Sequence, residues 1–177
     1  MKRILSALVL GLAFGGLSAC ATSPPSAPKA PIAAGGLIDR YDPEAIHSIL
    51  SEMQLTVADE SVNSAGKPFM TVDMPGGASL RIMGESCEGK GKDQVCAGIQ
   101  LSTQFAPTGD VDFDKAMATA NRTLRPAKLF WAGDTLAYER YLIMDGGVSR
   151  ANLMENISVY VEILQGLMSQ LFKDADN

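Results

Sequence analysis

The chain contains a single histidine, His47, and this scarcity excludes most designs of catalytic site. A serine nucleophile needs a base within hydrogen-bond reach, and the sequence has no Gly-x-Ser-x-Gly segment and no spacing that brings a serine to His47. His47 is one position off an apolar helical stripe, so we expect it at the surface or at the core boundary. We therefore predict that the protein is not an enzyme and holds no cofactor and no metal.

Basic side chains are also few. The sequence has 15 Lys and Arg against 20 Asp and Glu, which gives a net charge of −5, and its basic residues form no cluster. An acidic chain without a basic stripe binds nucleic acid poorly because the phosphate backbone is itself negative. We therefore expect no nucleic-acid partner.

The acidic side chains suggest one metal motif only loosely. Asp110, Asp112 and Asp114 are spaced like the start of a calcium loop, but the sixth and twelfth places hold Lys115 and Asn121 instead of Gly and Glu. We interpret the cluster as an acidic loop that caps a helix.

Long apolar runs are absent, and the longest one, Ile4 to Leu17, has only about fourteen residues, whereas a membrane-spanning helix needs roughly twenty. The run follows two basic residues and ends at Leu17-Ser18-Ala19-Cys20, which is the arrangement of a secretory signal. A cysteine at this place resembles the bacterial lipoprotein signal. We predict that residues 1–19 are a signal peptide and that Cys20 carries lipid; the alternative is an ordinary signal with a chance cysteine.

A proline-rich and alanine-rich segment follows the predicted lipidation site. Four of the nine prolines lie in residues 20–36, so this segment is predicted to be an extended tether rather than helix or central strand. In enteric lipoproteins a residue other than Asp after the lipidated cysteine, here Ala21, implies outer-membrane sorting. We expect a lipid anchor at the periplasmic face of the cell envelope, in the outer membrane.

The other two cysteines form a natural pair if Cys20 carries lipid. Cys87 and Cys96 flank a polar loop between two strand-like runs, and export favours oxidation. We predict a structural disulfide. A redox or metal pair is the alternative, but redox pairs usually have Cys-x-x-Cys spacing, and no histidine lies nearby to complete a zinc site.

The rest of the chain is predicted to be one domain, residues 37–173, with a polar tail at 174–177. Apolar spacing and capping residues predict three helices, at 43–54, 112–124 and 150–172. Alternating runs separated by Pro, Gly and Asp predict six strands, at 55–60, 68–74, 79–84, 96–105, 128–132 and 135–144. The order α-β-β-β-β-α-β-β-α indicates an α+β fold with an antiparallel sheet of five to six strands.

Two aromatic residues flank the predicted hairpin at Gly133-Asp134. Trp131 and Tyr138 are expected to face each other near this turn or to pack on the last helix. They are candidate partner-binding residues, because an aromatic patch on a sheet can receive an extended segment of another protein. The alternative is that they belong to the core.

Several segments together resemble a known family. They are Asp42-Pro43 leading to Ile49-Leu50, Gly66-Lys67-Pro68, the Cys87 and Cys96 pair running into Ile99-Gln100-Leu101, Asn121, and Asp145-Gly146-Gly147-Val148-Ser149 before Leu153. With these segments the chain resembles the YbjN-like domain, a family labelled as bacterial sensory transduction regulators. The resemblance implies a fold like that of type III secretion chaperones, a homodimer as a candidate state, and no established chemistry.

These observations favour a lipid-anchored periplasmic module that binds an unknown protein partner in a chaperone-like or regulatory role. One alternative is a structural envelope lipoprotein of a membrane assembly. The other is a small-molecule-binding protein or a hydrolase with an unrecognised site.

Overall fold

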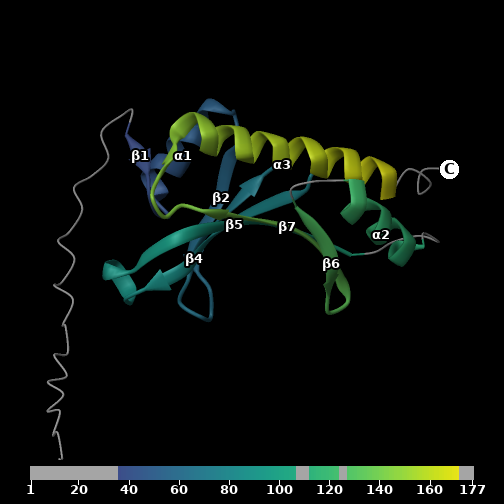
Figure 1. Ribbon diagram of the computed structural model, residues 1–177, viewed down its shortest axis with the longest axis horizontal. Helices are drawn as coiled ribbons and strands as arrows, with labels where there is room; N and C mark the ends of the chain where they lie inside the picture. Colours follow the sequence, from purple (N-terminus) through teal and green to yellow (C-terminus); the bar gives the residue numbers. More distant parts are fainter. Residues whose placement is uncertain (1–35, 107–111, 124–126, 172–177) are drawn as a thin grey trace, which may run out of the picture. The chain divides into compact units, whose positions relative to one another are not determined.

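A computed structural model describes residues 36–106, 112–123 and 127–171 of the chain (Figure 1). These residues lie within one compact unit, residues 32–177. The predicted signal peptide 1–19, the lipidated Cys20, nearly all of the tether 20–36 and the tail 174–177 lie outside the described residues. The described residues therefore belong almost entirely to the domain predicted at 37–173.

The described residues form three α-helices, one short 3₁₀ helix and eight strands. In chain order they are β1 (Leu37–Ile38), α1 (Pro43–Glu52), β2 (Thr56–Val62), β3 (Pro68–Asp73), β4 (Ser79–Glu88), η1 (Gly91–Asp93), β5 (Val95–Phe105), α2 (Phe113–Thr123), β6 (Lys128–Ala132), β7 (Thr135–Ile143), β8 (Val148–Ser149) and α3 (Arg150–Leu171).

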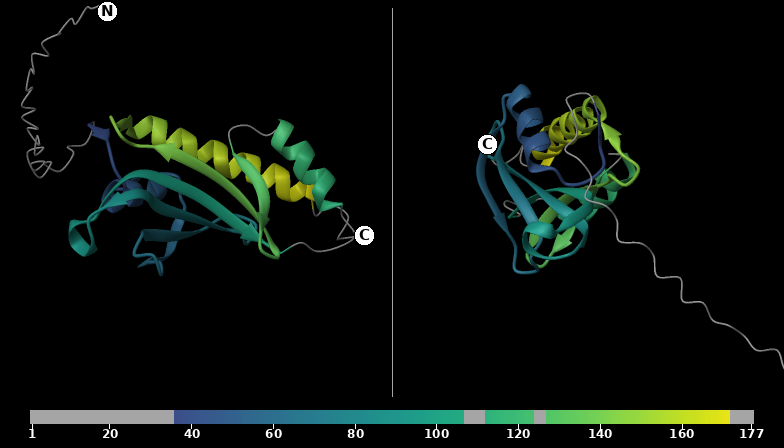
Figure 2. Two further views of the ribbon diagram at one scale, coloured as in Figure 1. Left: turned by 60° about the horizontal axis from the view of Figure 1, so that its bottom comes forward. Right: turned by 90° about the vertical axis from the view of Figure 1, so that its left-hand side faces the viewer.

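Six of the strands form one antiparallel sheet in the order β2-β3-β4-β5-β7-β6. All three helices lie on the same side of this sheet, and α1 and α3 run next to each other (Figure 2). The predicted α+β class, with three helices and a sheet of up to six strands, is confirmed. The other side of the sheet carries no described helix, and we call it the open face.

Helix α1 begins as its sequence predicts. The Asp42 side chain caps it, because its Oδ1 accepts a hydrogen bond from the Ala45 N–H at 3.1 Å, and Pro43 occupies the first turn. The helix ends at Glu52, two residues before the expected Gln54, which has a φ of +60°. This left-handed conformation cannot continue a helix.

Helix α3 lies along the sheet and covers much of its length (Figure 1). The Ser149 hydroxyl caps it, accepting from the Asn152 N–H at 3.1 Å. Five residues of the predicted apolar stripe are buried: Leu153, Ile157, Leu164, Leu167 and Leu171. Tyr160 joins them unpredicted, and its hydroxyl donates to the Tyr138 carbonyl at 2.7 Å.

Strand alternation separates the core from the open face. Ile99 and Leu101 of β5 point to the helices and are fully buried, whereas Gln100 between them points the other way. The register carries this division across the sheet. The open face thus includes Phe69, Thr71, Ser79, Arg81, Met83, Gln100, Ser102, Gln104, Phe130, Glu139 and Tyr141.

Both edge strands of the sheet are protected. The β6 edge is covered by α2, where the Asn121 side chain bonds both backbone groups of Leu129: its Nδ2 donates to the carbonyl at 2.7 Å, and its Oδ1 accepts from the N–H at 2.8 Å. The β2 edge is exposed but carries Asp59 and Glu60 and has a register shift after Val57. Charges and bulges on an edge discourage pairing with another strand.

A second sheet of two strands was not predicted. Leu37 pairs with Ser149, and Ile38 pairs with Val148. Two residues are too few to show a period of two, so the sequence gives no signal for these strands.

Cys87 and Cys96 lie directly opposite each other on β4 and β5, with Cα atoms 3.8 Å apart and their sulfur atoms at disulfide distance. The predicted pairing is confirmed. The bond closes the hairpin that contains η1.

Candidate functional site on the open face

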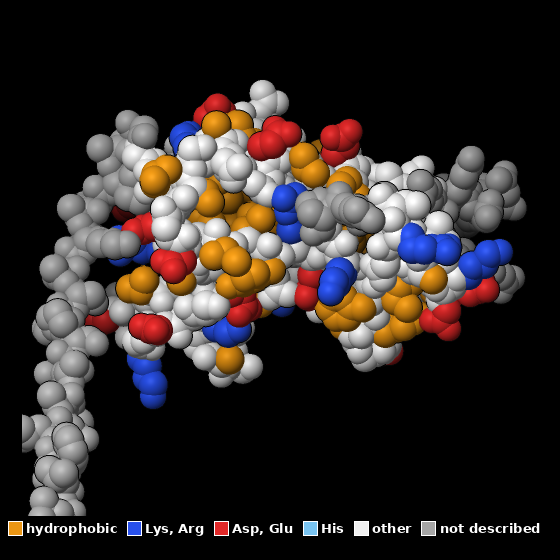
Figure 3. Space-filling model, in the orientation of Figure 1, with side chains coloured by type: hydrophobic (Ala, Val, Ile, Leu, Met, Phe, Trp, Pro, Cys, Tyr) orange, Lys and Arg blue, Asp and Glu red, His pale blue; other side chains and the backbone are white. Residues whose placement is uncertain are grey.

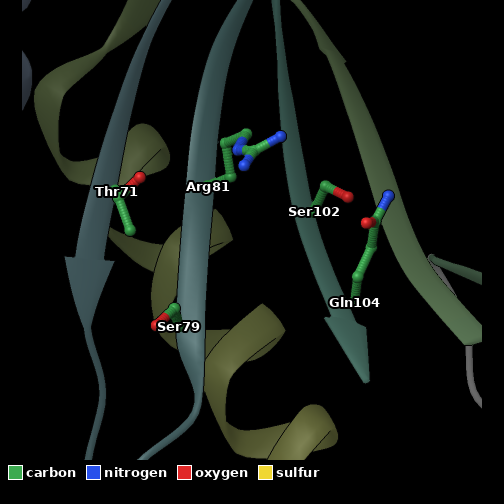
Figure 4. Close-up of a pocket in the computed structure, with 5 residues that line it drawn as sticks. All are labelled: Thr71, Ser79, Arg81, Ser102 and Gln104. Atoms are coloured by element: carbon green, nitrogen blue, oxygen red, sulfur yellow. The ribbon is translucent and has the colours of Figure 1, made fainter. Parts of the chain in front are cut away.

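The open face contains two adjoining hollows. The first has a volume of about 120 Å³ and is lined by Thr71, Ser79, Arg81, Ser102 and Gln104 (Figure 4). The second has a volume of about 340 Å³ and is lined by Gln100, Lys128, Phe130, Glu139, Arg140 and Tyr141. Strand β5 supplies residues to both, so the two hollows lie next to each other across the sheet.

Arg81 provides the charge of the first hollow. Register places it between Thr71 on β3 and Ser102 on β5, and its side chain extends toward β5 (Figure 4). The guanidinium carbon lies 4.9 Å from the centre of the Phe69 ring, which is a cation–π contact. Among the described residues, no carboxylate forms an ion pair with Arg81.

Tyr141 lies against the sheet because the residue beneath it is glycine. A Cβ on Gly98 would be 2.3 Å from the Tyr141 hydroxyl oxygen and 2.7 Å from Cζ. The tyrosine hydroxyl forms a hydrogen bond with Ser86 Oγ at 3.0 Å. Tyr141 is nevertheless 49% exposed, so the second hollow presents a fixed aromatic surface to the outside.

One carboxylate on this face, that of Glu139, already has a partner, and Asp59 and Asp73 lie opposite Thr71 and Ser79 in the register. The Ser102 hydroxyl donates to Glu139 Oε1 at 3.2 Å, and Lys128 is directly opposite Glu139 in the sheet. Phe130, on the same edge strand as Lys128, is 38% exposed. In the orientation of Figure 3, hydrophobic side chains gather over β6 and its hairpin to β7, and basic and acidic side chains are interspersed.

Tyr138 does not belong to this surface, and its assignment as a partner-binding residue is wrong. It is opposite Leu129 on β6 and Thr103 on β5, on the side that the helices cover, and it is 1% exposed. Its ring packs on Tyr160 with centroids 5.0 Å apart. Burial raises the pKa of its hydroxyl to about 12.

Trp131 is accessible but points toward the helix side. It is 41% exposed, its indole N–H donates to Asp114 Oδ1 at 3.0 Å, and its ring contacts Phe113 edge-on at 6.3 Å. It does not face Tyr138, because its partner in the register is Leu136. Trp131 thus attaches α2 to the sheet.

The polar residues singled out in the sequence have structural contacts. His47 is at the surface as expected, with Nε2 3.0 Å from Glu60 Oε2. Asp112 caps α2 as expected and accepts from the Lys115 N–H at 3.0 Å, whereas Asp110 lies outside the described residues. Within residues 36–106, 112–123 and 127–171, no three His, Cys, Asp or Glu side chains are grouped to hold a metal ion.

Arg140 approaches the second hollow from β7 but directs its guanidinium to the helix side. It pairs with Leu101 in the register and donates to Asn156 Oδ1 on α3. Burial lowers the pKa of this guanidinium. Arg140 therefore links the sheet to α3.

No described helix is long and apolar enough to cross a membrane.

Comparison with known proteins supports the fold alone. No model of a protein family matches this chain, and no curated protein matches it. The crystal structure of an uncharacterized protein from Methanothermobacter thermautotrophicus has a similar fold, with a TM-score of 0.52 and 14% sequence identity. The match covers 73% of this chain and 96% of that one. The resemblance to the YbjN-like domain therefore stays a prediction.

Sequence reasoning did not single out the three side chains that shape the open face, Arg81, Phe130 and Tyr141. The alternation in β5 predicted its polar side, and the apolar Leu80 and Ile82 imply that Arg81 faces away from the core. Combining the two patterns would have placed Arg81 beside the polar side of β5.

Proposed function

We propose that this protein is a lipid-anchored periplasmic module that binds an extended segment of a partner protein across its open face, in a chaperone-like or regulatory role. The observation that carries the proposal is the pair of adjoining hollows on a sheet side that no described element covers. Their lining combines aromatic rings with hydrogen-bonding side chains, which is the composition that binding surfaces favour.

The open face is a better candidate than either edge of the sheet. Asn121 occupies the outward backbone groups of Leu129 on β6, and acidic side chains occupy β2. Strand addition needs free backbone donors and acceptors on an edge. A partner on the open face instead contacts side chains and leaves the sheet unchanged.

The two hollows together favour an elongated ligand. The first uses residues from β3, β4 and β5, and the second uses residues from β5, β7 and β6. A segment that occupies both must cross the strands, because the hollows succeed each other across the sheet. Adjacent strands are about 4.8 Å apart, so such a segment spans several residues in an extended conformation.

The predicted localisation supports a role in the cell envelope. Lipid on Cys20 would anchor the chain, and the sixteen or so tether residues, at roughly 3.1 Å each, reach about 50 Å. The folded unit could then meet periplasmic segments at a distance from the membrane. A Cys20→Ala precursor is expected to lose labelling by a fatty-acid probe, and retained labelling would contradict the anchor.

The proposal is tested by cross-linking in cells from two matched positions. Gln104 on the open face and Gln165 on α3 are both exposed glutamines. Each is replaced in turn by a photo-reactive amino acid in the full chain, and the adducts are identified by mass spectrometry. We expect a partner adduct from position 104 and none from position 165.

The other outcomes are informative. Equal adducts from both positions would show non-specific contact, and adducts from position 165 alone would place the partner on the helices. Adducts of the chain with itself from position 104 would make the open face a dimer interface. Each of these results would contradict the proposal.

A further inference from the structure

The lining of the first hollow contains a basic side chain and no acidic one, although the chain as a whole is acidic. Arg81 supplies a guanidinium with five N–H donors, and no described carboxylate pairs with it. Its contact with the Phe69 ring, at 4.9 Å, uses one face of the guanidinium and orients it. The N–H groups along the edge of the guanidinium that faces β5 remain available to a ligand.

The other lining groups add donors rather than competing negative charge. Thr71 and Ser79 bear hydroxyls and Gln104 bears an amide, and these three can donate to an anion, whereas the one hydroxyl proton of Ser102 is directed to Glu139. The nearest carboxylate in the next hollow, that of Glu139, already accepts from Ser102 at 3.2 Å. A carboxylate placed in the first hollow would thus meet a cation and neutral donors in the lining itself, with Asp59 opposite Thr71 and Asp73 opposite Ser79 at its border.

We propose that the first hollow binds the carboxylate of an aspartate or glutamate side chain in the partner segment, with Arg81 as its ion-pair partner. This inference rests on the proposed function and names the chemistry that the partner must carry. Arginine suits the role because its planar fork of donors matches a carboxylate. The adjoining rings of Phe130 and Tyr141 would receive an apolar residue of the same segment.

A side-chain carboxylate fits better than a carboxyl terminus. Terminal carboxylates are held by backbone N–H groups arranged in a nest, whereas every group that lines this hollow comes from strands whose backbone is in the sheet ladder. The hollow also opens onto the second one across β5, so the bound chain can continue through it.

The test selects ligands from a library of short random peptides displayed as fusions through their C-termini, so that none has a free terminal carboxylate. The bait is the full chain with Cys20→Ser in a mild detergent. Selection is repeated on Arg81→Gln and on the matched control Arg122→Gln, an exposed arginine of α2 outside both hollows. Thermal unfolding of each variant confirms that it folds.

We expect the peptides selected on the wild-type chain and on Arg122→Gln to be enriched in Asp or Glu over the library, and those selected on Arg81→Gln not to be. For one selected peptide, Arg81→Gln should weaken binding about five- to tenfold. Replacing the acidic residue of this peptide by Asn or Gln should weaken its binding to the wild-type chain by the same factor. The same replacement should weaken binding to Arg81→Gln by less than about twofold, because both changes remove the same interaction.

Two kinds of failure are distinguishable. If peptides are selected but lack acidic enrichment, or keep it on Arg81→Gln, the carboxylate site is wrong and the proposed function stands. If no peptide binds above background, the binding of extended segments itself is contradicted. A synthetic peptide whose only carboxylate is its C-terminus forms the last arm, and preferential binding of that peptide would overturn the choice of a side-chain carboxylate.

Discussion

Replacing Gly98 by alanine should move Tyr141 without unfolding the protein. The new Cβ would lie 2.3 Å from the tyrosine hydroxyl oxygen, 2.7 Å from Cζ and 2.9 Å from Cε2. These distances are too short for any non-bonded carbon, so one group must give way. The backbone of Gly98 is held by β4 and β7 on both sides, whereas the tyrosine ring is half exposed and can swing outward.

The cost to stability should be small. The displaced ring loses its hydrogen bond to Ser86, which contributes at most about 1 kcal/mol at an exposed site. Alanine in a strand recovers roughly 0.5–1 kcal/mol relative to glycine, because glycine loses more backbone entropy on folding. The two effects oppose each other, so the free energy of unfolding should change by less than about 1 kcal/mol.

Urea unfolding measures the stability of this variant, and the cross-linking yield at position 104 measures its binding. Gly166→Ala is the matched control, because a Cβ there meets no atom within 4 Å, and helix propensity alone should stabilise it by about 1 kcal/mol. We expect Gly98→Ala to lose binding and Gly166→Ala to keep it. If Gly98→Ala lowers the free energy of unfolding by more than about 2 kcal/mol, Tyr141 cannot move aside. If binding is undiminished, the position of Tyr141 does not matter for binding.

Three further predictions concern stability. The Tyr138 hydroxyl is buried without a hydrogen-bond partner among the described residues, so Tyr138→Phe should be neutral or stabilising by up to about 1 kcal/mol. Burial raises the pKa of this hydroxyl from 10.0 to about 12, so the stability that its protonated form contributes is complete below pH 10 and is lost as the pH rises to about 12. In a series of unfolding midpoints measured against pH, Tyr138→Phe should therefore reduce the fall in stability at alkaline pH. An unchanged alkaline fall would contradict this prediction. Reducing the Cys87–Cys96 bond should lower the free energy of unfolding by about 2–3 kcal/mol, measured by urea unfolding with and without reductant, and no change would show that the hairpin needs no cross-link. Asn121→Ala removes two hydrogen bonds to Leu129 and should cost about 1–3 kcal/mol; hydrogen exchange should then rise at the Leu129 amide, and continued protection would show that another group covers it.

The fold was predictable where a pattern extends over several turns or strand repeats. In α3 the apolar spacing alone indicates which side packs on the sheet, because Leu153, Ile157 and Leu164 recur at helical intervals. Tyr160 was missed because a hydroxyl looks unsuited to a core until a carbonyl acceptor is known to lie beside it. That acceptor belongs to Tyr138, on a strand distant in sequence.

The candidate site was harder to predict because β7 has apolar residues on both of its faces. Leu136 and Tyr138 point to the helices, whereas Tyr141 and Ile143 lie on the open face. With apolar residues on each face, alternation does not tell which tyrosine is buried. The groups that receive the two rings belong to other elements: Tyr160 on α3 packs on Tyr138, and Gly98 on β5 makes room for Tyr141.

Asn121 also limits how copies of this protein can assemble. The Asn121 amide uses one N–H donor and its oxygen acceptor here, the same pair that a neighbouring strand would offer to Leu129. It therefore ends the sheet at β6, and a seventh strand from another molecule cannot bond there until α2 detaches. An intact dimer must therefore form through another surface, and polymerisation through this edge would first require local unfolding of α2.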